Sequence, residues 1–277
     1  MINQYKCNIN KLTIELSTYS SLDFEELKFI ISNMVQLGIN NINLDLKNTI
    51  DYNYLINIVD FISSECNTYD IGITSECIGI QPYLKQLKNS GLRDIVICID
   101  SLKQYKYKNI HYGANVNDII KIINTCINLK LNTTLKCIVV NGFNNDEISD
   151  YISMTKSLPI NICFSEIIPR NNKLEEFNKS YIKVESILDS NSNLYKVEDN
   201  YRKTYKLSNS VGTVYIESHN DNKKCINCNE VIITDNGLLK TCVHKNSAFD
   251  IKTYMYKPII FKETVKEIIY LREKTNI

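Results

Sequence analysis

Three cysteines near the carboxy-terminal end of the chain have the type and spacing of a metal-binding site. Cys225 and Cys228 are separated by two residues, and Cys242 follows further along. Thiolates are soft ligands that select zinc or an iron–sulfur cluster, and three of them leave either centre one ligand short. The fourth ligand is either another side chain, such as His219 or His244 in a structural zinc site, or an open position. The residues therefore predict a metal centre on Cys225, Cys228 and Cys242 and leave the metal itself open.

The stretch between Cys228 and Cys242 predicts a β-hairpin. Glu230 to Thr234 is a β-branched run, Asp235-Asn236-Gly237 supplies residues that tolerate positive φ, and Leu238 to Val243 forms the return strand. The return strand should bring Cys242 back beside the earlier pair of cysteines.

Composition limits the class of protein. The chain has 277 residues, of which 44% are hydrophobic, enough to fill one α/β barrel or two domains. Its net charge is +1 with acids and bases interspersed, so no footprint for nucleic acid or anionic membrane is expected. No signal peptide opens the chain, and no apolar run approaches the roughly 18 residues of a membrane span. Ten cysteines, most of them without framework spacing, fit reduced thiols, so we expect a cytoplasmic protein.

The elements that must position these cysteines follow a strand–helix pattern. Six short apolar runs alternate with helical patterns, at Lys11–Ser17, Asn41–Leu46, Tyr69–Thr74, Asp94–Ile99, Asn132–Val140 and Asn161–Ile168. Such repeats need right-handed crossovers and a parallel sheet, which gives a partial barrel or a doubly wound sheet. In either case the strand–helix repeats occupy residues 1–170 of an α/β fold, and residues 171–277 form a smaller second unit.

Two pairs of residues have the spacing of helix capping boxes. Asp23 and Glu26 precede a helical repeat that should stop at Gly38, and Asn144 and Glu147 precede the helix after the fifth strand. A further helix is expected near Tyr181 to Leu188, with strands at Tyr201–Leu207 and Val211–Glu217.

Charged residues in the fifth and sixth strands form a possible pocket. Lys136 and Glu166 interrupt apolar strands, where charge is costly unless it is paired, so the two side chains are expected to meet. Alternatively, Lys136 receives an anionic group. Asp100 and Ser101 end the fourth strand and Arg170 follows the sixth, at the rim where ligands gather. Other cysteines inside these strands, Cys98, Cys137 and Cys163, are expected to be small buried hydrophobes.

Four stretches of the chain, taken in order, carry a further signal. They are residues 91–102, which end in Asp100-Ser101-Leu102, residues 135–147, residues 163–169, and residues 225–242 with the three cysteines. Together they resemble the MoaA-type GTP 3',8-cyclase family of molybdenum cofactor biosynthesis, part of the radical S-adenosylmethionine (SAM) superfamily. The resemblance implies that Cys225, Cys228 and Cys242 hold one 4Fe-4S cluster with an open iron, and that Lys136 corresponds to a lysine that binds nucleotide phosphates.

The chain departs from that family where radical chemistry starts. The family carries Cys-x3-Cys-x2-Cys on the loop after the first strand, where a second cluster cleaves SAM. Here Ser17 passes through Thr18 to Ser21 directly into the helix at Asp23, and no cysteine lies between Cys7 and Cys66. The glycine-rich SAM-binding segment appears as Asp45 to Asn48 without glycine, and two family arginines are replaced by Glu230 and Ile232.

Together with the resemblance, these features predict a partial (βα)6 TIM-like barrel in residues 1–170, a smaller carboxy-terminal iron–sulfur domain in residues 171–277, and no SAM-cleaving cluster. The leading hypothesis is an accessory or ligand-binding protein that works beside a radical SAM enzyme, or as a homodimer, and takes a small anionic or nucleotide-like ligand. The alternative is a non-radical lyase or transferase that uses the open iron on a nucleotide-like or sulfur-containing substrate, with Lys136 or Glu166 as the anion-binding or proton-handling group. A cyclase-type radical enzyme is the least favoured hypothesis.

Overall fold

The computed structural model describes residues 1, 8–47, 50–66, 68, 70–111, 114–167, 179–197, 202–218, 228–242 and 247–271. The fold is mixed α/β with parallel strand pairing at its centre. It divides into two compact units, one of Met1–Ser75, Pro82–Asp94 and Asn222–Ile277, the other of Glu76–Gln81 and Ile95–Asp221. No helix in the described ranges has both the length and the apolar character needed to cross a bilayer.

The first unit contains six strands in the order β12-β11-β10-β1-β2-β3. Its elements are β1 (Lys11–Leu16), α1 (Phe24–Gln36), β2 (Asn41–Leu46), α2 (Tyr52–Ser64), β3 (Asp70–Ser75), η1 (Gln81–Tyr83, at its edge), α3 (Leu84–Asn89), β10 (Glu230–Ile233), β11 (Leu238–Lys240), β12 (Phe249–Asp250), η3 (Lys252–Tyr254) and α10 (Pro258–Tyr270). β1 pairs in parallel with β2 on one side and with β10 on the other, whereas β10, β11 and β12 are antiparallel. The carboxy-terminal hairpin therefore extends the amino-terminal sheet.

The ends of α1 are determined by local sequence. The Asp23 side chain accepts a hydrogen bond from the Glu26 amide at 2.8 Å, and the Glu26 carboxylate accepts one from the Asp23 amide at 3.0 Å. Gly38, with φ of 97°, follows the last turn in a conformation that favours glycine. The predicted capping box and stop are both confirmed.

The second unit contains six strands in the order β4-β5-β6-β9-β8-β7. Its elements are β4 (Asp94–Cys98, which begins at its edge), α4 (Gln104–Ile110), α5 (Val116–Asn128), β5 (Asn132–Val139), η2 (Asn145–Glu147), α6 (Ile148–Met154), β6 (Ile160–Glu166), α8 (Val184–Asp189), β7 (Leu194–Val197), β8 (Lys203–Leu207) and β9 (Val214–Glu217). β6 pairs in parallel with β5 and with β9, and β9, β8 and β7 are antiparallel. Gly212 allows the close approach of the chain before β9, because a Cβ there would lie 1.8 Å from the Ile160 carbonyl oxygen.

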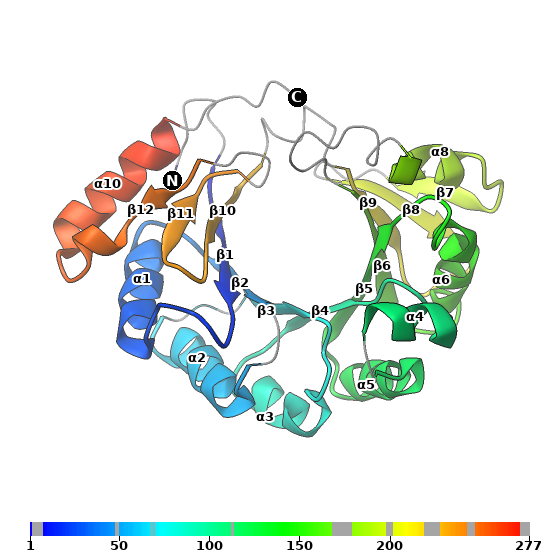
Figure 1. Cartoon of the computed structure of the whole chain (residues 1–277), viewed down its shortest axis with the longest axis horizontal. Helices are drawn as coiled ribbons and strands as arrows, with labels where there is room; N and C mark the ends of the chain where they lie inside the picture. Colours follow the sequence, from blue (N-terminus) through cyan, green and yellow to red (C-terminus); the bar gives the residue numbers. More distant parts are fainter. Residues whose placement is uncertain are drawn as a thin grey trace. The chain divides into compact units, whose positions relative to one another are not determined.

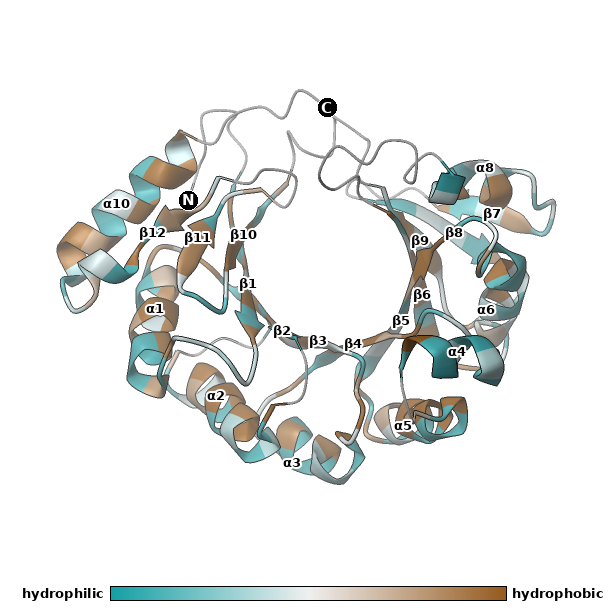
Figure 2. Ribbon diagram, viewed as in Figure 1, coloured by the Kyte–Doolittle hydropathy of each residue, from teal (hydrophilic) through white to brown (hydrophobic). Residues whose placement is uncertain are grey.

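Helices cover the strands in each unit along one face (Figure 1). In Figure 2 the helices carry both hydrophobic and hydrophilic segments, as amphipathic helices that cover a sheet should. α5 is an example, since its buried residues recur at helical spacing: Val116, Ile119, Ile122, Ile123 and Cys126.

All six predicted strands are present, with ends shifted by no more than about two residues. β7 and β12 were not predicted. Predicted ends at Tyr69, Ile168, Tyr201 and Val243 lie outside the described residues. The predicted domain boundary at residue 170 also lies outside them and stays a prediction, while the contacts group residues 222–277 with the amino-terminal strands.

Candidate functional site

A row of polar residues lies on one face of the central strands of the second unit. The strand register sets Lys136 of β5 beside Cys163 of β6, and Cys163 beside Tyr215 of β9. Two residues further along these strands, Ser165 lies beside Glu217. Since side chains at even spacing share a face of a strand, Lys136 and Glu217 project from the same side of the sheet.

Lys136 forms its ion pair with Glu217, at 2.5 Å between Nζ and Oε2. Burial by itself lowers the pKa of Lys136, but the adjacent Glu217 carboxylate more than reverses this and raises the pKa overall. The lysine is therefore charged. The predicted pair with Glu166 is wrong, because Glu166 is in register with Val139, three residues from Lys136 and so on the opposite face.

Glu166 is buried and satisfied on that opposite face. Its carboxylate accepts hydrogen bonds from the Val184 amide at 3.1 Å, from the Ser218 hydroxyl at 2.8 Å and from the Tyr181 hydroxyl at 3.3 Å. These bonds tie the end of β6 to the start of α8 and to the end of β9. Glu166 therefore has a structural role at the carboxyl end of β6.

A second cation lies over Tyr215, which is in register with Lys136 across the intervening Cys163. The Arg202 guanidinium carbon is 4.6 Å from the centre of the Tyr215 ring, a cation–π geometry. The sequence analysis missed Arg202, Tyr215 and Glu217, although their strands were predicted, because nothing in the sequence showed that β9 would pair with β6. An anion on this face would be attracted by Lys136 and Arg202 and would compete with Glu217 for Lys136.

Two of the cysteines in these strands are poorly suited to act as nucleophiles. Cys137 and Cys163 are each 1% exposed, as predicted, and burial raises the pKa of both thiols. A thiol kept protonated is a poor nucleophile. Cys98 is half-buried.

Asp100 lies at the end of β4 and is half-buried. Its carboxylate accepts a hydrogen bond from the Ile138 amide at 3.2 Å. Burial raises the pKa of Asp100, opposed by that hydrogen bond and by the nearby His111. A carboxylate with a raised pKa near a lysine is a common feature of binding sites.

Ser101 has no exposed surface. Its hydroxyl lies 2.8 and 2.9 Å from the two carboxylate oxygens of Glu147, which also accepts from the Leu102 amide at 2.7 Å and pairs with Lys106 at 3.0 Å. Ser101 therefore belongs to a buried network at the strand ends. In this arrangement it does not face a ligand.

Asn144 and Glu147 do not form the predicted capping box, and neither η2 nor α6 has a side-chain cap at its start. The Asn144 amide donates to the carbonyl oxygens of Asp100 at 2.7 Å and Ile138 at 2.8 Å. The predicted helix is present, but this pair is used across the sheet: Asn144 joins the ends of β4 and β5, and Glu147 holds the turn after β4. The sequence spacing of a capping box cannot distinguish these roles.

The cysteine trio is described in part. Cys228 precedes β10, Cys242 follows β11, and Cys225, His219 and His244 lie outside the described residues, as does Arg170. The predicted hairpin is confirmed, with Thr234 bonded to Leu238 at 2.9 Å and Gly237 at φ of 76°. Extending the register of Ile232 with Lys240 places Cys242 opposite Glu230, two residues from Cys228.

Two soft thiols thus lie at the same open end of the hairpin, a donor set that suits zinc or an iron–sulfur cluster. Within the part of the chain that the structure describes, no group of three or more histidine, cysteine or acidic residues is placed to hold a metal. Because Cys225 is outside that part, the trio itself stays a prediction.

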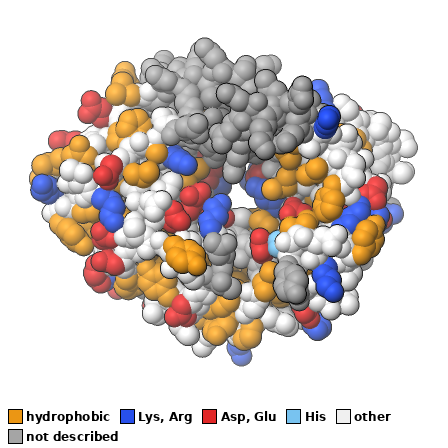
Figure 3. All heavy atoms as spheres, in the orientation of Figure 1, with side chains coloured by type: hydrophobic (Ala, Val, Ile, Leu, Met, Phe, Trp, Pro, Cys, Tyr) orange, Lys and Arg blue, Asp and Glu red, His pale blue; other side chains and the backbone are white. Residues whose placement is uncertain are grey.

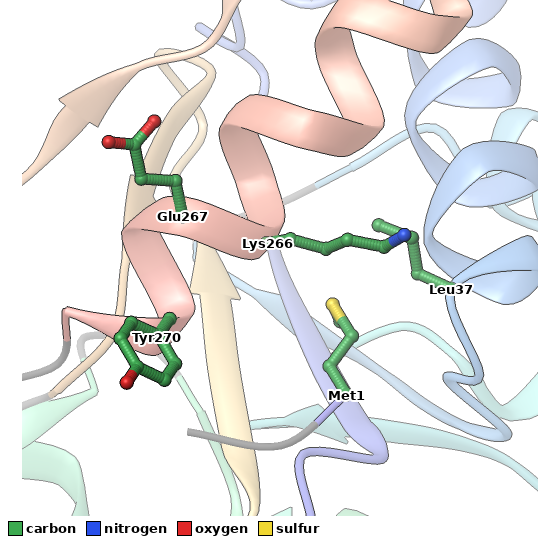
Figure 4. Close-up of a pocket in the computed structure, with 5 residues that line it drawn as sticks. All are labelled: Met1, Leu37, Lys266, Glu267 and Tyr270. Carbon is green, nitrogen blue, oxygen red and sulfur yellow. The ribbon is translucent and has the colours of Figure 1, made fainter. Parts of the chain in front are cut away.

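A separate pocket of about 470 Å³ lies in the first unit, along α10. Figure 4 shows Lys266 extending between Met1 and Leu37, with Glu267 and Tyr270 further along the helix. None of these residues was predicted as a site. Its charged side chains are Lys266 and Glu267, without the convergent polar groups that mark a catalytic pocket.

Charge is mixed over the surface seen in Figure 3, where acidic and basic side chains are interspersed. This agrees with the near balance of 32 basic and 31 acidic residues in the whole chain.

No protein-family model matches the chain. Among solved structures, its fold is similar to that of Streptococcus suis SuiB, with a TM-score of 0.63, 10% identity, and coverage of 96% of this chain and 67% of that one. It is also similar to anSMEcpe, solved with AdoMet and a Cp18Cys peptide, with a TM-score of 0.54, 9% identity, and coverage of 95% and 84%. At these identities the likeness concerns the fold alone.

Sequence similarity is closer to a group of enzymes. The chain is 32% identical over 234 residues to the GTP 3',8-cyclase of Alkaliphilus oremlandii, which covers 83% of this chain and 73% of that protein. It is 29% identical over 255 residues to the GTP 3',8-cyclase of Clostridium botulinum strain Okra, which covers 89% of this chain and 79% of that protein. Identity at this level along most of both chains indicates common descent, so the chain belongs to the GTP 3',8-cyclase family.

Proposed function

We propose that this chain is a family member that holds one carboxy-terminal 4Fe-4S cluster and lacks the cluster that cleaves SAM. It would act as an accessory or ligand-binding protein beside a radical SAM enzyme. The observation that carries this proposal is the connection between β1 and α1. Residues 17–23 join the two elements directly and contain no cysteine, at the position where the family resemblance places the SAM-cleaving cluster.

The connection between β1 and α1 is short and is held by hydrogen bonds to Asp235. The Ser17 hydroxyl donates to the Asp235 carboxylate at 3.0 Å, and the Ser20 hydroxyl and the Ser21 amide donate to the Asp235 carbonyl oxygen at 3.0 and 2.9 Å. Asp235 belongs to the turn of the β10–β11 hairpin. These bonds support a compact turn after β1 that leaves no residues for a cluster-binding loop.

In contrast, the chain keeps the three cysteines of the carboxy-terminal centre. Cys228 and Cys242 lie at the open end of the same hairpin, and Cys225 provides the third thiolate of the set. A cluster bound there would supply an open iron that takes a ligand. Family membership also supports a partial (βα)6 barrel arrangement and a reducing, cytoplasmic location, where such thiolates persist.

The test is anaerobic reconstitution with iron and sulfide, followed by metal analysis and an EPR spectrum of the reduced protein. We expect about four irons per chain, as a cluster of this type holds, lost in Cys225→Ala, Cys228→Ala and Cys242→Ala. Cys66→Ser is the matched control and should keep the iron. One zinc per chain and no iron would contradict the cluster and indicate a structural zinc site instead.

A second assay tests the missing radical chemistry. The reduced, reconstituted protein is incubated with SAM, and 5'-deoxyadenosine is measured by mass spectrometry. We expect none above the level of the Cys228→Ala variant. Production of deoxyadenosine, or about eight irons per chain from two clusters, would contradict the proposal and favour the hypothesis of a radical cyclase.

A second function is favoured by the charged face of the second unit. Lys136 and Arg202 supply two cations, and Asp100, with its raised pKa, supplies a group that exchanges protons. This combination suits a non-radical lyase or transferase acting on a nucleotide-like substrate. Turnover of GTP by the reconstituted protein, absent in Lys136→Met, would favour this function over the accessory role.

A further inference from the structure

A buried histidine and tyrosine in the second unit form a site that the proposed function does not use. His111 follows α4 directly, and its Nδ1 lies 3.2 Å from Oε2 of Glu76. Because a carboxylate oxygen only accepts hydrogen bonds, this contact places a proton on Nδ1. In the neutral ring, Nε2 is then an acceptor that points away from Glu76.

Tyr107 lies one helical turn before His111, with the two rings 4.7 Å apart. Tyr107 is 0% exposed and the His111 side chain 9% exposed. Neither the Tyr107 hydroxyl nor His111 Nε2 has a hydrogen-bond partner among the described residues. Other buried tyrosines in this unit do have one: Tyr151 donates to the Ile99 carbonyl and Tyr205 to Asp189, both at 2.7 Å. Buried polar atoms are almost always hydrogen-bonded, so these two atoms on adjacent rings need partners.

The chemistry of the two atoms limits what one partner shared by both can be. Nε2 needs a donor and the tyrosine O–H needs an acceptor, so a carbonyl satisfies only the tyrosine. A carboxylate or phosphate would also be repelled by Glu76 and Asp100, which both act on this cluster. An ammonium group satisfies the histidine but leaves the tyrosine proton unpaired. A hydroxyl group does both.

We propose that His111 and Tyr107 bind one hydroxyl group, which accepts from the Tyr107 hydroxyl and donates to His111 Nε2, while Glu76 holds the imidazole in the required tautomer. The group belongs either to an alcohol on a neutral, polyol-like ligand or to a bound water molecule. All three residues lie in the second unit. Hydroxyl binding at these residues therefore does not depend on the iron–sulfur cluster.

The test uses the full-length protein labelled with 15N-histidine and long-range 1H–15N NMR spectra, with the His111 signals identified by their loss in His111→Gln. We expect the tautomer protonated at Nδ1. Titration with glycerol should shift the Nε2 signal in a saturable way, and Tyr107→Phe should weaken glycerol binding about tenfold, since it removes one hydrogen bond from a buried site. Tyr105→Phe, on the same helix at a residue that is 65% exposed, is the matched control.

The outcomes distinguish the two sources of the hydroxyl. A saturable glycerol shift assigns the site to an alcohol. No glycerol shift, together with a cross-peak between the imidazole and a slowly exchanging water that is lost in Tyr107→Phe, assigns it to water. Absence of both signals would overturn the proposal, as would an Nε2-protonated tautomer or a stronger response to methylammonium than to glycerol.

Discussion

Lys136 on β5 and Glu217 on β9 form a 2.5 Å ion pair that reaches across the intervening strand β6. The lysine side chain is 27% exposed and the glutamate side chain 41% exposed, so solvent reaches both groups. A pair of this kind contributes little to stability. An anion that binds Lys136 would have to displace the Glu217 carboxylate.

We expect Glu217→Gln to raise the affinity for tripolyphosphate about threefold, because it removes a competitor worth less than about 1 kcal/mol. Lys136→Met should lower that affinity at least about tenfold, since a charge-assisted hydrogen bond is lost. Isothermal titration calorimetry measures both. Lys156→Met, which removes an exposed lysine after α6, is the control. Unchanged binding in Lys136→Met would show that this face does not receive anions.

Glu147→Ala should lower the free energy of unfolding by about 2–3 kcal/mol, because it leaves the buried Ser101 hydroxyl and the Leu102 amide without their acceptor, while Lys106 keeps its pair with Asp146. Ser101→Ala should cost about 1–2 kcal/mol. Urea denaturation gives both values. Asp146→Ala is the matched control: Asp146 bridges Lys103 and Lys106 but its side chain is 51% exposed, so its loss should cost much less than the loss of Glu147. Equal losses of unfolding free energy in Glu147→Ala and Asp146→Ala would contradict the expected difference between a buried and an exposed carboxylate.

Asp100 should make the protein less stable as the pH rises. Burial raises the pKa of Asp100 above its ordinary 3.8, so between the unfolded and folded pKa values the native chain binds more protons. The unfolding free energy therefore falls as the pH rises through this window. Asp100→Asn removes the titration and keeps an acceptor for the Ile138 amide.

The variant should thus gain stability relative to the wild type as the pH rises from 3.8 upward. Urea denaturation of both proteins across this range measures the gain. A difference that does not change with pH would be inconsistent with the raised pKa.

Asp23→Ala should cost about 1 kcal/mol of unfolding free energy, because it removes the amino-terminal cap of α1. Glu25→Ala, in the same turn, removes only an exposed pair with Lys28 and should cost less than about 0.5 kcal/mol. The two variants are compared by chemical denaturation. If they behave alike, the cap does not stabilise α1.

Local sequence patterns were sufficient to predict most elements of this fold. The strands at Asn41–Leu46 and Asn132–Val139, the capping box of Asp23 and the hairpin turn at Gly237 depend on neighbouring residues, whose periodicity and backbone preferences act over a few positions. The order of the motifs was also sufficient to identify the family, because spacing is preserved along the chain.

The sequence by itself also determined which residues can do chemistry: three thiols near the end of the chain, and Lys136 and Asp100 at the strands. The partners of those residues were decided only by the tertiary structure. Lys136 contacts Glu217 instead of Glu166, Asn144 joins two strand ends instead of capping a helix, and His111 contacts Glu76. The physical reason is strand register, since a shift of one residue moves a side chain to the other face of the sheet, and register between distant strands is fixed by packing rather than by any local pattern.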